Sequence, residues 1–256
     1  MQAYDESFYS RQRHQSLESA KVIVPIVLEL AKPRSVVDVG CGLGTWLSIF
    51  RQHGVEDVLG LDGDYVDRKQ LLVNASEFRA VDLSRGFRLE RKFDLAVSLE
   101  VAEHLPLESA ASFVDSIAGL APCVLFSAGL PFQGGTNHIN EQWPEFWVDH
   151  FSRNKFVVID CIRKQVWRRR EVQPCYAQNS FMFIHEEQFD QLPGLKALSG
   201  ESNLMQLSVV HPEIYLSRAD PARQSFRAAA GEALDVGKQA FKRRLKALLG
   251  ARKTAR

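Results

Sequence analysis

Short apolar runs alternate with amphipathic segments along most of the chain. The runs are rich in β-branched and aromatic residues and end at polar residues or glycine, a pattern that predicts buried strands. Strands are predicted over 35–39, 58–62, 78–81, 93–99, 123–127, 156–161 and 180–184. Apolar residues at helical spacing predict helices over 16–30, 45–50, 66–73, 106–120, 141–151 and 225–249. Residues 207–212 are expected to form a further strand or a packed loop.

The order of these elements predicts an α/β fold. Strands that alternate with helices favour a doubly wound, mostly parallel sheet of seven strands. The last two predicted strands lack a long helix between them, so we expect them to form an antiparallel pair at one edge. The chain then divides into an N-terminal arm and helix over 1–34 and a main α/β domain over 35–185. A C-terminal extension over 186–224 and a basic amphipathic helix over 225–256 follow.

A glycine-rich turn follows the first predicted strand. Gly40, Gly42 and Gly44 turn the chain sharply and leave bare backbone where a ligand can approach. The next helix begins at Thr45, so the turn ends at free N–H groups. Asp62 closes the second strand, 18 residues after Gly44, where a carboxylate can accept hydrogen bonds from both hydroxyls of a ribose. Strand, turn, helix and acid together predict a nucleotide-type cradle.

Composition restricts the class of protein. The 256 residues are 45% apolar and 25% charged, typical of a globular domain with room for one large core. The four cysteines show no Cys-x-x-Cys spacing, which argues against a disulfide framework or a zinc site and favours a reducing compartment. The N-terminal residues show no apolar signal core, and no apolar run is long enough to span a bilayer. We therefore expect a cytoplasmic protein.

The total charge is near zero, but it is distributed unevenly along the chain. From Lys238 onward the chain carries eight Lys or Arg residues and no acid, so the preceding residues carry a net charge of −7. An acidic body disfavours nucleic acid as a partner. The basic C-terminal helix is expected either to be a solvated helix or to bind an anionic membrane surface or an acidic protein, which would place the protein at the inner face of the membrane.

Several motifs over about 35–185 resemble those of the class I S-adenosylmethionine-dependent methyltransferases. They are Val-Asp-Val-Gly-Cys-Gly-Leu-Gly from Val37, Leu61-Asp62, Ala-Val-Asp-Leu from Ala80, and the segment Phe93–Leu105 with its Glu-Val-Ala-Glu-His. A nicotinamide-dependent dehydrogenase would instead prefer Gly-x-Gly-x-x-Gly. The resemblance implies S-adenosyl-L-methionine as cofactor and a Rossmann-like methyltransferase sheet with a reversed last strand.

The resemblance also assigns cofactor contacts. The methionine part falls on Asp38, Gly40, Cys41, Gly42 and Gly44, the ribose on Asp62, adenine near Gly63, Asp82 and Leu83, and the floor of the site on Ser98 and Leu99. An acidic rim suits a sulfonium cation. For Asp38 the alternative is a purely structural hydrogen bond to the backbone of the turn.

Candidates for the chemistry follow the fourth and fifth strands, because ligands lie at the carboxyl ends of parallel strands. The motif Glu100-x-x-Glu103-His104, with His138 beyond the next strand, resembles the metal site of small-RNA and ubiquinone-pathway O-methyltransferases. This implies Glu100, Glu103, His104 and His138 as ligands of Mg²⁺ or Mn²⁺. The alternative is metal-free: the two acids cap a helix, His104 packs behind the cofactor, and His138 acts as general base.

The acceptor is predicted from the polar segment Gly134–Trp143. Its amides and the aromatic residues beside it are the groups that hold sugars, and the segment resembles bacterial methyltransferases of surface-polysaccharide gene sets. We expect methyl transfer to a hydroxyl of a sugar, a glycan or a similar small molecule. The alternatives are a metal-assisted enzyme for another diol or catechol, and a non-catalytic scaffold that only binds the cofactor.

Overall fold

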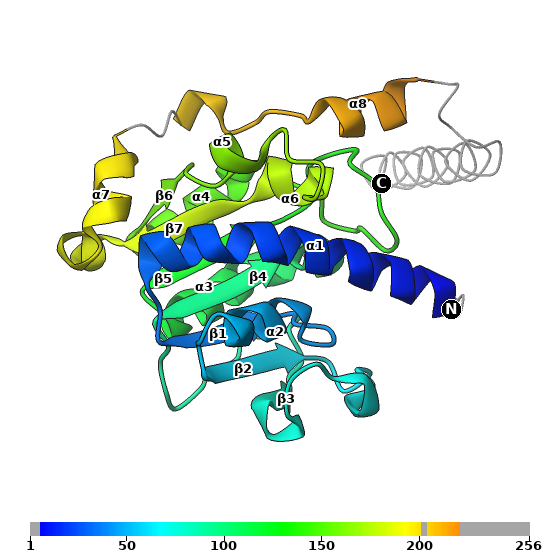
Figure 1. Cartoon of the computed structure of the whole chain (residues 1–256). Coiled ribbons are helices and arrows are strands. Elements are labelled where there is room, and N and C mark those ends of the chain that lie inside the picture. Colours follow the sequence, from blue (N-terminus) through cyan, green and yellow to red (C-terminus); the bar gives the residue numbers. More distant parts are fainter. Residues whose placement is uncertain (1–5, 201–203, 221–256) are drawn as a thin grey trace, which may run out of the picture. The chain divides into compact units, whose positions relative to one another are not determined.

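The computed structural model describes residues 6–200 and 204–220 (Figure 1). Its seven strands form one sheet in the order β3-β2-β1-β4-β5-β7-β6. The strands are β1 (Ser35–Val39), β2 (Asp57–Asp62), β3 (Phe78–Ala80), β4 (Leu95–Leu99), β5 (Cys123–Ser127), β6 (Phe156–Ile159) and β7 (Phe181–His185). β7 runs antiparallel to both β5 and β6, and the other pairs are parallel. The predicted fold, with its reversed last strand, is confirmed.

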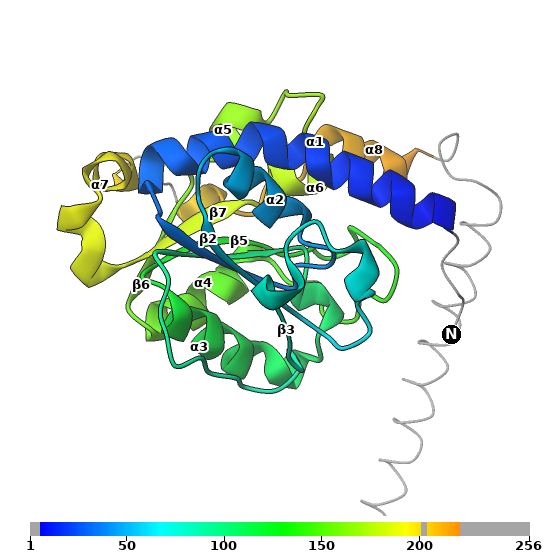
Figure 2. The same ribbon diagram turned by 60° about the horizontal axis from the view of Figure 1, so that its bottom comes forward.

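Helices cover both faces of this sheet, as Figure 2 shows, with α1 and α2 on one side and α3 and α4 on the other. The helices are α1 (Glu6–Ala31), α2 (Thr45–Gln52), α3 (Ala110–Leu120), α4 (Pro144–Arg153), α5 (Arg163–Val166), α6 (Pro174–Asn179), α7 (Pro193–Ser199) and α8 (Pro212–Ala219). Successive strand residues alternate between the two cores: Val36 packs with α1 and α2, and Val37 packs with α3.

Several predicted elements are corrected. α1 begins at Glu6, so most of the predicted arm is helical; it lacks apolar periodicity but also lacks a helix breaker before Pro25. The predicted helix over 66–73 is replaced by two 3₁₀ turns, Arg68–Gln70 and Ala75–Glu77, the first of which is capped by the Asp67 side chain. α4 starts at Pro144, because proline suits the first turn of a helix.

The C-terminal part is only partly described. Residues 207–211 form a packed loop rather than a strand, with Leu207 buried. The described residues up to His211 belong to one compact unit and those from Pro212 to a second. The predicted basic helix over 225–256 lies outside the described residues. None of the described helices combines the length and apolarity needed to cross a bilayer.

A buried arginine anchors the edge of the sheet that carries β6. Arg163 lies over the ring of Phe181 and forms a bidentate ion pair with Asp160, at 2.9 and 2.6 Å. Its guanidinium also donates to the backbone carbonyls of Gln178, Gln206 and Leu207. One cation thus fixes the end of α6 and the packed loop next to it.

Replacing Arg163 with methionine should lower the free energy of unfolding by about 3–5 kcal/mol, because Asp160 would lose its bidentate pair and three carbonyls would lose this donor in a buried setting. Urea unfolding followed by circular dichroism measures the change. The control, Arg153→Met, breaks an exposed pair with Asp149 and should cost less than about 1 kcal/mol. A loss for Arg163→Met as small as that of the control would contradict this role.

Candidate active site

The glycine turn lies where β1 ends beside β2. The parallel register pairs Val39 with Leu61, and the Gly40 N–H donates to the Leu61 carbonyl at 2.7 Å. Gly40 has a φ of +85°, and a Cβ there would lie 2.3 Å from the Val101 side chain, so no other residue fits. Gly42 also has a positive φ, but the space beside its Cα is open. The turn therefore presents bare backbone to an open cradle.

Asp62 ties the two strand ends together. One of its carboxylate oxygens accepts from the Gly42 N–H at 2.7 Å, and the other accepts from the Gly63 N–H and the Tyr65 hydroxyl at 2.6 and 2.5 Å. The Tyr65 ring covers Gly63 but is 84% exposed. In this arrangement the tyrosine hydroxyl occupies the oxygen that the resemblance assigns to a ribose hydroxyl.

We expect Tyr65→Phe to bind S-adenosylhomocysteine about threefold to tenfold more tightly, because the ribose would no longer compete for the Asp62 oxygen. Isothermal titration calorimetry at fixed salt measures the affinity. Asp62→Asn, which alters the shared acceptor itself, should weaken binding instead. Weaker binding by Tyr65→Phe would mean that the hydroxyl contacts the cofactor and does not compete with it.

Asp38 is the second acid of the cradle. It is 2% exposed, and its Oδ2 is buried without a hydrogen-bond partner in the described part of the chain. Burial, followed by the charge of Asp62, raises the pKa of Asp38 to about 8. A cationic ligand in the cradle would relieve this cost, so the residue fits a sulfonium or ammonium group.

The other predicted cofactor residues differ in burial and in hydrogen bonding. Leu83, Ser98 and Leu99 are buried, and the Ser98 hydroxyl has no hydrogen-bond partner among the described residues. Gly44 is the N-cap of α2, and the Cys41 thiol is buried against Gly60. Asp82 is exposed, and its carboxylate binds the N–H and hydroxyl of Ser84, so it remains only a predicted adenine contact.

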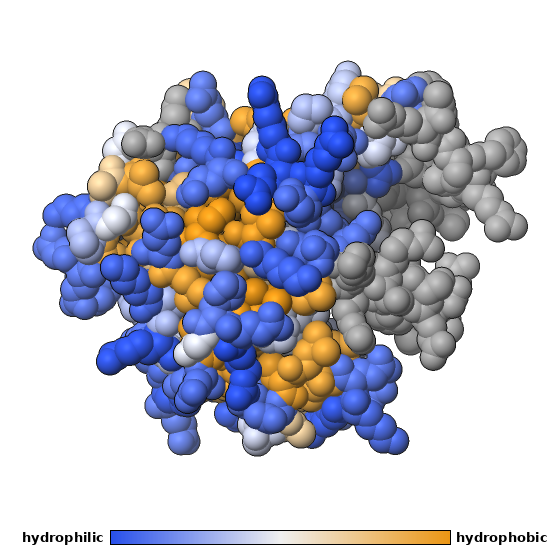
Figure 3. Space-filling view, in the orientation of Figure 1, coloured by the Kyte–Doolittle hydropathy of each residue, from blue (hydrophilic) through white to orange (hydrophobic). Residues whose placement is uncertain are grey.

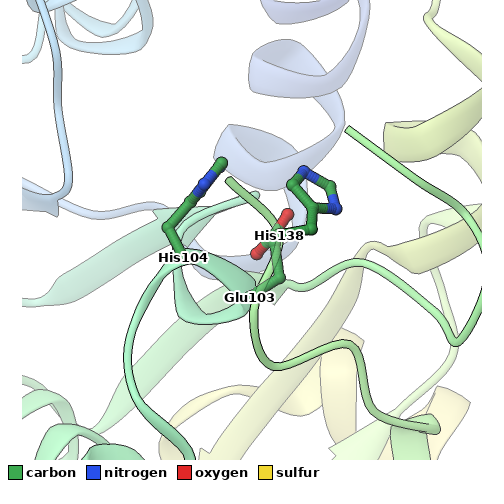
Figure 4. A group of neighbouring side chains, drawn as sticks. All are labelled: Glu103, His104 and His138. Atoms are coloured by element: carbon green, nitrogen blue, oxygen red, sulfur yellow. The ribbon is translucent and has the colours of Figure 1, made fainter. Parts of the chain in front are cut away.

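Three of the four predicted metal ligands come together beyond β4 and β5 (Figure 4). One ligand atom each from Glu103, His104 and His138 lies within 4.8 Å of the others, and the two rings meet edge to face. Glu103 is fully buried, and neither of its oxygens makes a hydrogen bond of normal geometry. Burial and then the charge of Glu100 raise its pKa; its own N–H and that of Gly129 offset this only in part.

Glu141 organises the loop that carries His138. One carboxylate accepts from the N–H groups of Phe132 and Gly134, at 2.8 and 2.6 Å, and pairs with Nδ1 of His138 at 3.0 Å. Burial opposes ionisation, but these bonds, that of His138 foremost, lower the pKa of Glu141. With Nδ1 held in this way, Nε2 of His138 is the nitrogen left for chemistry.

Glu100, the fourth predicted ligand, does not join this group. Its carboxylate accepts hydrogen bonds from Gln133 and Asn179 at 2.9 and 3.1 Å. Gln178 in turn donates to the side-chain oxygens of Gln133 and Asn179. We call Glu100, Gln133, Gln178 and Asn179 the amide cluster. Glu100 holds a φ of +54°, a strained conformation typical of functional sites.

Known proteins are similar to this chain in sequence domain and in fold. Residues 9–129, just under half of the chain, match the family model described as a methyltransferase domain. No curated protein matches the chain. The sugar N-methyltransferase KedS8 from Streptoalloteichus sp. ATCC 53650 is 15% identical over 72% of this chain and 96% of its own, with a TM-score of 0.55.

Two further solved structures are similar to parts of the chain. The SAM-bound amino pentose methyltransferase CalS10 from Micromonospora echinaspora is 15% identical over 72% of this chain and 99% of its own, with a TM-score of 0.50. Streptomyces venezuelae DesVI is 26% identical, but the match covers 52% of this chain and 62% of DesVI, with a TM-score of 0.42. Residues 9–129 thus match a methyltransferase domain, and together with the sheet order and the cradle this match supports S-adenosylmethionine-dependent methyl transfer.

Proposed function

We propose that this methyltransferase acts on a hydroxyl of a sugar or a similarly hydroxylated small molecule. The observation that carries the proposal is the buried, unpartnered carboxylate of Glu103 between two histidines. A hydroxyl must lose its proton to attack a methyl group, whereas an amine attacks once it is neutral. A site with a carboxylate and two imidazoles beside the cofactor cradle is suited to removing the proton of a hydroxyl.

The same three residues fit a divalent cation. Glu103 offers two oxygens that lack other partners, and Glu141 holds the His138 ring from behind, as an outer carboxylate does for a metal-bound histidine. We propose that Glu103, His104 and His138 hold this cation; when bound, it would lower the pKa of an acceptor hydroxyl. Of the two predicted ions, Mn²⁺ suits imidazole ligands better than Mg²⁺, which prefers oxygen.

The surroundings support a sugar as the acceptor. The amide cluster lies next to Glu103, His104 and His138, which we call the Glu103 group, because Gln133 and His138 both lie against Gly129. Phe132 and Trp143 on the same loop are 87% and 43% exposed. Amides bind sugar hydroxyls, and exposed aromatic faces stack on sugar rings. KedS8 and CalS10 are, by name, methyltransferases of a sugar and of an amino pentose. A place in surface-polysaccharide biosynthesis is proposed from the loop's resemblance alone.

The proposal is tested by transfer of labelled methyl from S-adenosylmethionine to a panel of neutral sugars, amino sugars and catechols. We expect labelled methyl on sugar hydroxyls, loss of transfer with excess EDTA, and recovery with Mn²⁺. Full activity in EDTA would assign proton removal to His138 without a cation. Transfer only to amines or catechols would contradict the sugar hydroxyl, and no transfer despite cofactor binding would indicate a scaffold.

A further inference from the structure

The loop between α5 and α6 carries three consecutive arginines. Arg168, Arg169 and Arg170 are all exposed. Arg169 pairs with Glu171 at 3.6 Å, but both side chains are 52% exposed, so this pair is weak. Arg168 and Arg170 make no ion pair with any residue in the described ranges. Two guanidinium groups are therefore free to bind an anion.

The loop is held in a defined position. The Trp167 carbonyl accepts from Nε2 of His211 at 2.9 Å, and the two rings are in contact. The Val172 side chain is buried, and the Gln173 N–H donates to the hydroxyl of Ser19 in α1 at 2.9 Å. Because the loop is fixed at both ends, the backbone that carries the arginines is already ordered. This order lowers the entropy cost of binding a ligand.

The loop lies at the same end of the sheet as the proposed acceptor site. β6 and β5 are both antiparallel to β7, so their carboxyl ends point the same way, and the loop follows β6. His211 links the loop to the amide cluster, because its N–H donates to Gln178 at 2.6 Å and Gln178 donates to Gln133. Figure 3 shows strongly hydrophilic side chains projecting at this upper edge, over α5 and the loop to α6.

The charge of this loop differs from that of the cofactor site. Asp38, Asp62 and Glu103 line the cradle and the Glu103 group, and the chain before Lys238 is acidic overall. Arginine clusters on an acidic body mark a local anion site rather than general attraction to nucleic acid. The planar guanidinium matches phosphate oxygens with two parallel hydrogen bonds.

We propose that Arg168 and Arg170 bind a phosphate or diphosphate ester carried by the sugar acceptor. This inference rests on the proposed function, because it takes the acceptor to be a sugar that reaches from the amide cluster toward the loop. The enzyme would then methylate an activated, phosphate-linked sugar in preference to a free one. The reaction that supplies this acceptor is a transfer that joins a sugar to a phosphate carrier.

The test uses inorganic pyrophosphate as the probe, with EDTA present so that cation-bound pyrophosphate does not contribute. We expect the full-length protein to bind it, and Arg168→Gln/Arg170→Gln to bind at least tenfold more weakly. The control, Arg79→Gln/Arg88→Gln, removes the same charge from exposed positions on and after β3 and should bind as the wild type does. S-adenosylhomocysteine affinity should be equal in all three proteins.

Equal pyrophosphate binding by the Arg168/Arg170 variant, or none by the wild type, would overturn the proposal. So would arginine-dependent binding to vesicles of phosphatidylglycerol without binding to pyrophosphate, which would identify a membrane contact. In the methyl-transfer assay, the variant should raise the KM for hexose 1-phosphates at least tenfold without changing their kcat. The KM and kcat for neutral hexoses should not change. If no sugar is methylated but arginine-dependent pyrophosphate binding persists, the proposed acceptor fails and the phosphate site stands.

Discussion

Replacing Glu103 with methionine is expected to abolish methyl transfer and to make the cofactor-free protein more stable. Glu103 supplies two carboxylate oxygens to the Glu103 group, so turnover should fall about a thousandfold or more. The same oxygens are buried without partners of normal geometry, and such a group costs about 1–3 kcal/mol. A near-isosteric apolar side chain removes that cost, so function and stability should change in opposite directions.

Labelled-methyl assays and urea unfolding of the apo-protein measure the two effects. Glu108→Met provides the control, because Glu108 is exposed five residues further on and should change neither quantity appreciably. S-adenosylhomocysteine affinity should stay within about twofold in both variants, since the cradle is built by other residues. A Glu103→Met protein that keeps a tenth of the activity, or that is less stable than the wild type, would contradict this role.

His138→Ala is expected to lower kcat by about 100-fold to 10,000-fold, the range for losing a group that handles the reacting proton. Cofactor affinity should be unchanged, because no cofactor contact is assigned to His138. His150→Ala, at a half-buried position of α4 outside the Glu103 group, is the matched histidine control and should retain full activity. Activity retained by His138→Ala would remove this residue from the chemistry.

Glu141→Gln tests how His138 is held. A glutamine offers one oxygen where Glu141 offers two, so it cannot satisfy Phe132, Gly134 and His138 together. We expect kcat to fall about tenfold to 100-fold, less than for His138→Ala, with little change in unfolding free energy. A Glu141→Gln protein as inactive as His138→Ala would mean that Glu141 itself touches the acceptor.

The sheet was predictable from the sequence because its strands carry local signals. Residues 123–127 form a short, mostly apolar run that begins after Pro122 and ends at Ser127, and the structure has β5 over the same range. The glycine turn was equally predictable, since Gly40 is required by its positive φ and by the nearby Val101 side chain, and Gly42 by its positive φ. The gathering of Glu103, His104 and His138 followed from topology, because β4 and β5 are parallel neighbours and their carboxyl ends meet.

The remaining parts depend on contacts between distant residues. Glu141 lies in the predicted polar segment, but nothing local shows that it binds two loop N–H groups and His138. Asn179 and Gln178 come from α6, a short helix with no apolar period of its own, so their contact with Glu100 was not predictable. The binding of Asp62 by Tyr65 likewise arises from a side-chain placement that sequence spacing does not determine.

A crystal structure with S-adenosylhomocysteine bound tests the central claim most directly. We expect the adenosyl group against the bare backbone of Gly40 and Gly42, the ribose hydroxyls on Asp62 with the Tyr65 hydroxyl displaced, and the sulfur facing Glu103 and His138. A ligand that lies elsewhere, or whose sulfur faces away from Glu103 and His138, would contradict the proposed site.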